Sequence, residues 1–418
     1  MLSSDSNFSC DDPTVPLDIL VSLASCHPRD VSYDGILKGV CRTMSKENQP
    51  TTVFENCVRL LHLALDRGAC PNLLASSGIM GISLNCLKAT NSKQPGVLSK
   101  FEEDLAYVIV NAAGLQRDKS QLVEQGVVSV MERLLDSNCL GALSKSLPAI
   151  SKILAVSTVR RSFIDSGVLR KLLRYFKNNV SKSKSVSGFN LSQVTEVLMS
   201  LCYYSIELGP SDAREFASLL SLSLADDNAV TAPNAIYTNY LFIKGVSKED
   251  ATDLGLDVLV KPTLRHLGDD YHNMALEALK ILIPLDASHV DLFLEGGGLD
   301  AFSHLISSSS TEDRVSEPIC EIINFAVSRE MVIQKIIDCD LLSRLINNLR
   351  SPKYRHVLGM LKIVAQVLNG SAGSQAEYLA SLDCIGPICS NVSSDDTEMA
   401  TLALETLKDV SSSLDWLL

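Results

Sequence analysis

Apolar residues recur along the chain with the period of an α-helix, in long stretches that are separated by short polar breaks. Within each stretch they stand at positions i, i+3, i+4 and i+7, so they form one face of a helix. The runs of β-branched residues that a parallel sheet would need are not evident. The pattern predicts nine long helices: TVFENCVRLLHLAL, FEEDLAYVIVNAA, KSLPAISKILAVS, VTEVLMSLCYYSI, NAIYTNYLFIKGVS, HNMALEALKILIPL, VSEPICEIINFAVS, HVLGMLKIVAQVL and MATLALETLKDVS.

A shorter apolar segment precedes each long helix and begins at a small or polar residue. In AYVIVNAAGLQRDKSQLVEQGVVSVMERLL, a small helix is expected to end at Glu124 and Gln125, with a break at Gly126 and a new helix from Val127. Glycine suits this break because a residue without Cβ takes positive φ at least cost where two helices turn sharply. We expect the same break at Gly35, Gly78, Gly167, Gly255, Gly298, Asp340 and Cys384.

The breaks follow one another at a nearly constant interval. The successive gaps are 43, 48, 41, 88, 43, 42 and 44 residues, and REFASLLSLSL near Arg214 fills the long gap without a glycine. The chain is therefore predicted to consist of about nine units of about 44 residues. Periods of this length with two or three helices are typical of HEAT and armadillo arrays.

The unit resembles the armadillo repeat, which has a short first helix, a glycine-led second helix and a long third helix. The resemblance is clearest in Gly126 to Leu135, Gly167 to Phe176 and Gly298 to Ile306, whereas residues 205–250 are degenerate. The second helices mostly lack the family's proline after glycine, and the third helices seldom end in its Arg-Asn pair. HEAT repeats are a close alternative for some units. The resemblance implies an all-α fold, a right-handed α-solenoid superhelix of about nine armadillo/HEAT-like repeats.

The same pattern predicts the domain organisation. Residues 1–26 are expected to form an N-terminal segment with a capping helix, and residues 27–418 the repeat array. The polar stretch KNNVSKSKSVSGFNLS predicts a surface loop inserted near 177–192, which could serve as a docking or phosphorylation segment. A second irregular stretch, Asp226 to Asn239, predicts a break between helices and a hinge. Trp416 near the C-terminus is expected to cover the last repeat.

Charge and composition narrow the partners and the compartment. The net charge of −12 favours basic partners and disfavours nucleic acid. The beginning of the chain lacks the layout of a secretory signal, and no run of 18 apolar residues could span a membrane. We therefore expect a cytoplasmic protein that could also be nuclear, and a protein or peptide partner that carries a basic segment. The sequence does not indicate the oligomeric state.

The sequence offers no pattern that indicates catalysis. It contains no GxSxG, GxxxxGK[ST] or HExxH motif, and the three glycines of EGGGLD stand at a repeat break. The twelve cysteines are scattered singly without a CxxC pair, and the seven histidines are dispersed along the chain. We therefore expect no enzyme activity, no cofactor and no metal site, and most cysteines to be small buried apolar residues.

In armadillo proteins the third helices line a concave groove, and a residue near the end of each points into it. Aligning INFAVS, VNAAG and LHLAL predicts the groove residues of this chain by that resemblance. Ile243 and Ile281 interrupt the polar series and are expected to form an apolar contact spot. The polar and amphipathic members, some of which could pair with the backbone of an extended peptide, are His62, Asn111, Lys152, Tyr203, Asn324, Gln366 and Asp409.

The sequence therefore predicts a non-catalytic scaffold or adaptor that binds proteins in the groove of an armadillo-like superhelix. The alternative is a regulator of a nucleotide-binding partner, because the chain also resembles armadillo-like exchange factors for small GTPases and for chaperones. Such proteins grip a folded partner and change its nucleotide release without doing chemistry themselves. A labelled-nucleotide release assay would separate the two hypotheses.

Overall fold

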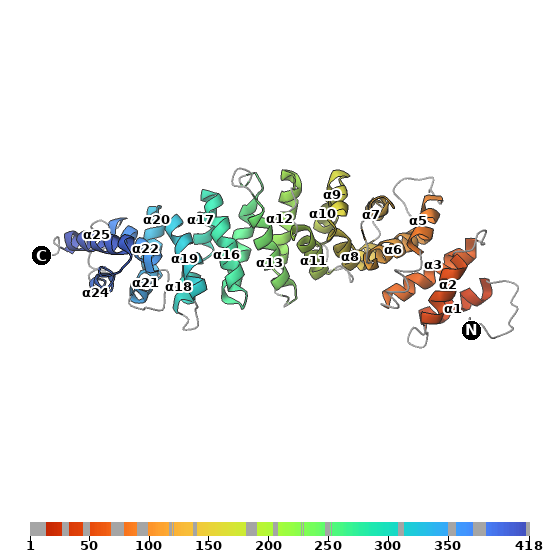
Figure 1. The fold of residues 1–418 in the computed structure, drawn as a ribbon, viewed down its shortest axis with the longest axis horizontal. Coiled ribbons are helices and arrows are strands. Elements are labelled where there is room, and N and C mark those ends of the chain that lie inside the picture. The colour runs from red at the N-terminus through yellow and green to blue at the C-terminus, as the bar shows by residue number, and fades with distance from the viewer. Residues whose placement is uncertain are drawn as a thin grey trace. The chain divides into compact units, whose positions relative to one another are not determined.

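The described part of the chain is helical throughout (Figure 1). The structure is a computed structural model. It divides into an N-terminal unit, Met1–Leu219, and a C-terminal unit, Leu220–Leu418, and the division falls inside helix α12. The all-α fold predicted from the sequence is confirmed. The structure describes residues 14–26, 33–44, 51–67, 79–89, 99–116, 119, 121–136, 140–180, 190–203, 208–226, 228, 230–246, 251, 253–307, 313–349, 357–370 and 382–414.

All nine predicted long helices are present and form one layer of packed third helices in each unit. In the N-terminal unit α3 packs on α6, α6 on α8, and α8 on α11. In the C-terminal unit the succession is α13, α16, α19, α22 and α25. Their bounds are α3 Thr51–Asp66, α6 Lys100–Leu115, α8 Leu140–Leu154, α11 Leu191–Cys202, α13 Thr231–Lys244, α16 His272–Leu282, α19 Asp313–Ala326, α22 Val357–Gly370 and α25 Thr397–Leu414.

Helix α6 shows why these segments are helical and where their faces go. Ser99 caps its first turn: the Ser99 hydroxyl accepts from the Glu102 amide, and the Glu102 carboxylate accepts from the Ser99 amide. Leu105 and Ile109 are fully buried between the neighbouring helices. Near the end of α6, Gly114 lies against Ala149 of α8 so closely that no side chain fits between them. Burial on two sides makes the third helices the core of each unit.

Shorter helices flank the third helices and complete the repeats. Second helices of successive repeats pack on one another, as α7 does on α10 and α18 on α21. The second helices are α2 Tyr33–Met44, α5 Ile79–Ala89, α7 Val127–Asp136, α10 Val168–Val180, α12 Pro210–Leu224, α15 Val260–Arg265 between the 3-10 turns η1 Leu256–Leu259 and η2 His266–Gly268, α18 Gly298–Ser307, α21 Leu341–Asn348 and α24 Ile385–Cys389. First helices are α9 Ser157–Asp165, α17 Ala287–Glu295 and α20 Glu330–Asp338, and the 3-10 turn η3 Ile283–Leu285 follows α16.

Backbone angles test the predicted helix breaks. Gly126, Gly167, Gly255 and Asp340 have positive φ, as expected for a sharp turn before a second helix. At two breaks the left-handed residue stands one position earlier than predicted. Gly297 has φ +76°, whereas Gly298 begins α18 and is buried.

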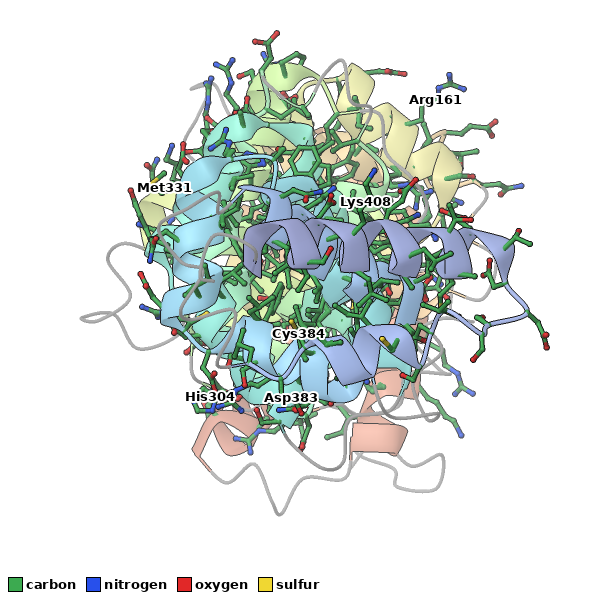
Figure 2. All side chains as sticks on the ribbon, turned by 90° about the vertical axis from the view of Figure 1, so that its left-hand side faces the viewer. Arg161, His304, Met331, Asp383, Cys384 and Lys408 are labelled. Carbon is green, nitrogen blue, oxygen red and sulfur yellow. The ribbon has the colours of Figure 1, made fainter. Side chains whose placement is uncertain are left out.

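Asp383, not Cys384, takes the left-handed conformation at the last break, with φ +43°. Cys384 is buried, and both residues stand at the start of α24 (Figure 2). The predicted break at Gly35 is wrong, because Gly35 lies in the first turn of α2. The sequence alone therefore does not distinguish a glycine that forms a turn from a glycine that packs against a neighbour or lies inside a helix. The predicted break at Gly78 lies outside the described residues.

Three other boundary predictions need correction. The predicted small helix before Gly126 is only a set of turns over residues 121–126. The loop predicted near 177–192 begins later, because α10 continues to Val180, and α11 already begins at Leu191. The break predicted from Asp226 to Asn239 is shorter, because α13 begins at Thr231. In the last two cases a helix extends into residues of weak helix propensity.

The chain ends show one further contact. Helix α1 (Thr14–Cys26) packs on α3, in the way that each third helix packs on the next. This is the contact that a capping helix would make, and the role itself stays a prediction. Trp416, expected to cover the last repeat, lies outside the described residues. No described helix is long and apolar enough to cross a membrane.

Candidate partner-binding surface

His62 of α3, the first of the predicted groove residues, is held by three side chains. Its Nδ1 lies 2.8 Å from Asp104 Oδ1 on α6, and its Nε2 lies 3.6 Å from Asp66 Oδ2 one turn further along α3. Its ring stacks on Tyr107 of α6 with 4.3 Å between the centroids. His62 is half-buried in this arrangement. Carboxylates on both ring nitrogens fix the orientation of the imidazole.

Further contacts extend this group into a cluster that crosses three third helices. The Tyr107 hydroxyl donates to Asp66 Oδ1 at 2.7 Å, and the Lys145 ammonium of α8 pairs with Asp66 Oδ2. Lys100 pairs with Asp104 at 3.2 Å. We call these six residues, His62, Asp66, Lys100, Asp104, Tyr107 and Lys145, the His62 cluster.

Protonation in the His62 cluster follows from burial and from the neighbouring charges. Burial acts to raise the pKa of the Asp104 carboxyl, but the hydrogen bonds and charges of His62 and Lys100 outweigh it, so this pKa lies below its ordinary value. Burial, together with the Asp66 carboxylate, raises the pKa of the Tyr107 hydroxyl. Asp104 is therefore an anion and Tyr107 a neutral donor at neutral pH.

We expect Asp104→Asn to lower the free energy of unfolding by about 2 kcal/mol at neutral pH, because it removes a buried charge-assisted partner of His62. Since the pKa of Asp104 is lowered by folding, its contribution is present above the ordinary value of 3.8 and is lost as pH falls through the lower folded value. Urea unfolding of both proteins, from neutral pH down to about pH 2, measures this loss.

Glu124→Gln is the matched control, because Glu124 is an exposed carboxylate of the same unit. Its unfolding free energy should stay within about 0.5 kcal/mol of the parent at every pH. Equal stability of Asp104→Asn and the parent at neutral pH would contradict a stabilising role for the cluster.

Asn111 and Asn324 occupy equivalent places in the two units. Asn111 Nδ2 donates to the Tyr107 carbonyl at 2.9 Å and lies 3.4 Å from Ser146 Oγ on the next third helix. Asn324 Nδ2 donates to the Gly359 carbonyl of the next third helix at 3.3 Å. Both bridges join residues 35 positions apart. Each amide nitrogen thus links two repeats, and whether the residues also bind a partner stays a prediction.

The remaining predicted groove residues differ in how accessible they are. Lys152, Tyr203 and Gln366 are exposed, and Asp409 is half-buried. All are placed on third helices except Tyr203, which caps the end of α11. The structure brings none of these four into the His62 cluster.

The apolar contact spot predicted at Ile243 and Ile281 is wrong for Ile243. This side chain is fully buried within α13 and cannot meet a partner. Ile281 is half-buried, so its part of the prediction stays open. The alignment could not separate these cases because an isoleucine suits both a core and a contact surface.

Several exposed apolar residues on third helices of the C-terminal unit are not predicted by the sequence pattern. Met274 on α16, Phe325 on α19 and Leu404 on α25 are exposed by 40%, 43% and 55%. Met274 and Phe325 depart from the burial that their helices give to most other large apolar residues. In the sequence, each of these residues differs from a core residue only by standing one position away from the expected core positions. Single apolar residues of this kind are common on protein surfaces.

Acidic residues accompany the apolar ones on this surface. Lys280 of α16 pairs with Glu321 of α19 at 3.0 Å. Burial acts to lower the pKa of Lys280, but Glu321 and the nearby carboxylates of Glu277 and Glu317 raise it overall. One ammonium group therefore faces three glutamates. A surface of this kind attracts additional positive charge.

The described residues offer little for metal or thiol chemistry. No described group of three histidine, cysteine or acidic side chains has a geometry that could hold a metal ion. Burial, together with the charge of a neighbouring residue in each case, raises the pKa of the Cys57 and Cys320 thiols to about 12, and burial alone raises that of Cys202 as well. Thiols of this kind are poor nucleophiles at neutral pH.

Comparisons with known proteins bear on the fold. No family model and no curated protein matches the chain. A chain from a structure described as a conserved phosphorylation switch controlling the interaction between cadherin and β-catenin matches with a TM-score of 0.64 at 14% identity, over 95% of this chain and 77% of that one. An engineered protein matches with a TM-score of 0.56 at 14% identity, over 97% of both chains.

A designed armadillo repeat protein covers 53% of this chain and 94% of its own length at 18% identity, with a TM-score of 0.43 that is too low to carry an argument. The two matches that cover nearly the whole chain agree with an array of helical repeats. In this chain the third helices stack on one another, and left-handed residues precede second helices. At these identities the likeness shows the fold alone. The chain therefore has the armadillo-type α-solenoid fold that its repeats predicted.

Proposed function

We propose that this chain is a non-catalytic protein-binding scaffold and that it holds an extended segment of a partner on its third helices. The observation that carries the proposal is the exposure of Phe325 on third helix α19, whose other large apolar residues are mostly buried, together with the exposure of Leu404 on third helix α25. Because each of these side chains is about half exposed, leaving it in water forgoes about 1 kcal/mol, which a partner that covers it would recover.

The charges around these residues favour a basic partner segment. Glu277, Glu317 and Glu321 surround Lys280, and the whole chain carries a net charge of −12. Lysine or arginine side chains of an extended peptide would reduce this excess of negative charge. Exposed amides such as Gln366 can donate to and accept from a peptide backbone without demanding a particular sequence.

We expect a photo-crosslinking amino acid at Gln366 to capture a partner that the same amino acid at Leu222 does not. Leu222 is the matched control because it is also exposed, by 41%, but lies on second helix α12. Crosslinking in the native cell, followed by mass spectrometry of the attached peptide, identifies both the partner and its contacting segment.

The captured segment, made as a peptide, then allows a quantitative test. Phe325→Ala and Leu404→Ala should each weaken its binding about tenfold, because each removes an apolar contact of more than about 1 kcal/mol, whereas Leu222→Ala should leave it unchanged. Added salt should weaken binding if the segment is basic. Crosslinking at Leu222 alone, or unchanged affinity of both third-helix variants, would rule out this surface.

A further inference from the structure

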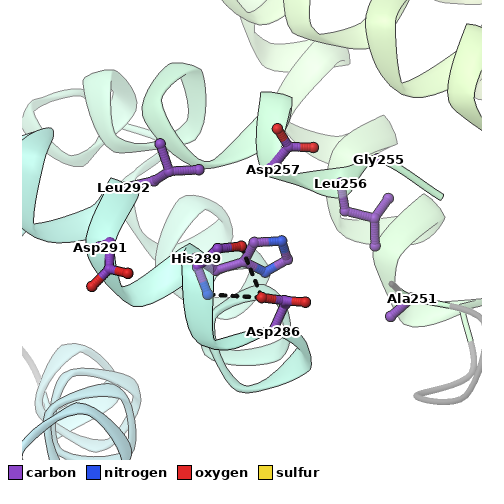
Figure 3. Close-up of a pocket in the computed structure, with 9 residues that line it drawn as sticks. Ala251, Gly255, Leu256, Asp257, Asp286, His289, Asp291 and Leu292 are labelled. Atoms are coloured by element: carbon purple, nitrogen blue, oxygen red, sulfur yellow. Dashed lines mark hydrogen bonds between the residues drawn. The ribbon is translucent and has the colours of Figure 1, made fainter. Parts of the chain in front are cut away.

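A pocket of about 360 Å³ lies in the C-terminal unit between the segment around Gly255 and first helix α17 (Figure 3). Its volume falls in the range of sites that bind small molecules or single side chains. None of its described lining residues belongs to a third helix, so it is separate from the surface proposed above. The lining residues are Ala251, Gly255, Leu256, Asp257, Asp286, Ser288, His289, Asp291 and Leu292.

Three aspartates give this pocket its charge. Asp291 is paired with Arg329 at 2.6 Å, which leaves Asp257 and Asp286 without an ion pair among the described residues. Asp286 caps α17: its Oδ1 accepts from the Ser288 amide at 2.7 Å and from the Ser288 hydroxyl at 2.8 Å. These two hydrogen bonds hold the pKa of Asp286 below its ordinary value. The Asp286 carboxyl is therefore ionised at neutral pH, with Oδ2 still available as an acceptor.

His289 provides a second and independent feature of the pocket. Its side chain is only 3% exposed, and its Nδ1 lies 2.7 Å from the Leu282 carbonyl oxygen. A carbonyl can only accept, so Nδ1 carries the hydrogen, and in the neutral ring Nε2 carries the lone pair. Nε2 has no partner among the described residues, and Figure 3 shows the ring next to Asp286. Because His289 lines the pocket, a ligand there can donate to this acceptor.

The available polar side-chain groups of the pocket are all acceptors. They are the Asp257 carboxylate, Asp286 Oδ2 and His289 Nε2, whereas the Ser288 hydroxyl already donates to Asp286. A suitable ligand must therefore bring several hydrogen-bond donors and positive charge. A guanidinium group has five such donors and an ammonium group three. These residues do not form a metal site, because no described group has a geometry that could hold a metal ion.

We propose that this pocket binds an organic cation, a guanidinium or primary ammonium group, between Asp257, Asp286 and His289. The group could belong to an arginine or lysine side chain of a partner or to a free polyamine, which share this chemistry. Its carboxylate contacts would be charge-assisted, and it would donate to Nε2, which has no partner among the described residues.

The test uses the full chain labelled with ¹³C at the histidine Cε1 positions and follows the His289 signal by NMR, with His289→Gln for assignment. N-acetyl-arginine amide should shift this signal with a millimolar dissociation constant, whereas the neutral analogue N-acetyl-citrulline amide should not. Spermidine is titrated in parallel. Tighter binding of the arginine probe would indicate that the natural ligand is a peptide side chain. Tighter binding of spermidine would indicate a free polyamine. Either result supports the cation pocket.

The double variant Asp257→Asn, Asp286→Asn removes both charges, while the asparagine amide oxygen at position 286 can still cap α17. It should weaken the arginine probe at least tenfold, since hydrogen bonds to charged groups contribute more than about 1.4 kcal/mol. Asp395→Asn, which removes an exposed charge elsewhere in the unit, should change nothing. If the double variant fails to fold, Asp257→Asn alone serves, because Asp257 is exposed. A shift caused equally by citrulline, or equal affinity of the charge-removing variant, would overturn the proposal.

Discussion

Replacing Gly114 with valine is expected to lower the free energy of unfolding of the N-terminal unit by about 3 kcal/mol. A Cβ on residue 114 would lie 2.9 Å from the Ala149 Cβ and 3.0 Å from the Ala149 Cα of α8. The Ala149 Cα is backbone, so it cannot rotate away, and α6 and α8 would have to separate. Denaturant unfolding followed by circular dichroism measures the loss.

Gly141→Ala is the control for Gly114→Val. Gly141 lies in α8, the helix that carries Ala149, and a Cβ on Gly141 would meet nothing within 4 Å. This change should leave stability unchanged or raise it by up to about 1 kcal/mol, since alanine favours helix more than glycine does. If Gly114→Val were as stable as the parent, the close approach of α6 and α8 would be wrong.

The second large effect is expected at Gly298, where alanine should cost about 3 kcal/mol. Its Cβ would lie 2.2 to 2.5 Å from three ring atoms of Phe293. The ring cannot yield easily, because Phe293 is fully buried and lies 5.1 Å from the Phe302 ring. Chemical unfolding of the purified variant, read by circular dichroism, measures the change.

Two comparisons make this prediction specific. At Gly297, where φ is +76°, alanine meets only backbone strain of about 1 to 2 kcal/mol and should cost less than at Gly298. Phe293→Leu should restore part of the stability of Gly298→Ala, giving a favourable coupling in a double-mutant cycle. A larger loss at Gly297, or no coupling, would show that Phe293 is not the obstacle.

The helices of this fold could be predicted closely because each third helix has an apolar period that burial on two sides requires. The breaks were harder, as the pair Gly297 and Gly298 shows. Two adjacent glycines serve different purposes there: one takes a left-handed turn and the other leaves room for Phe293. A sequence records the absence of a side chain but not the reason for it.

The contacts of the candidate surface were harder to predict from the sequence than the helices. His62 was found as a polar residue near the end of a third helix, but its partners Asp104 and Tyr107 stand about one repeat away, at separations that depend on how the helices pack. The pocket near His289 depends on a backbone contact to Leu282 that no pattern of letters reports. Both arrangements arise from packing between repeats, which varies with each loop length.

The spacing of the cross-repeat hydrogen bonds has a consequence for biosynthesis. His62 meets Asp104 across 42 positions and Asn324 meets Gly359 across 35, so a residue finds its native neighbour soon after it has left the ribosome. Chains in which contacts are sequence-local have low contact order and can form structure progressively from the N-terminus. Each newly made repeat would then dock on a surface that its predecessor has already organised, and the nascent chain would expose at most one unfinished end at a time.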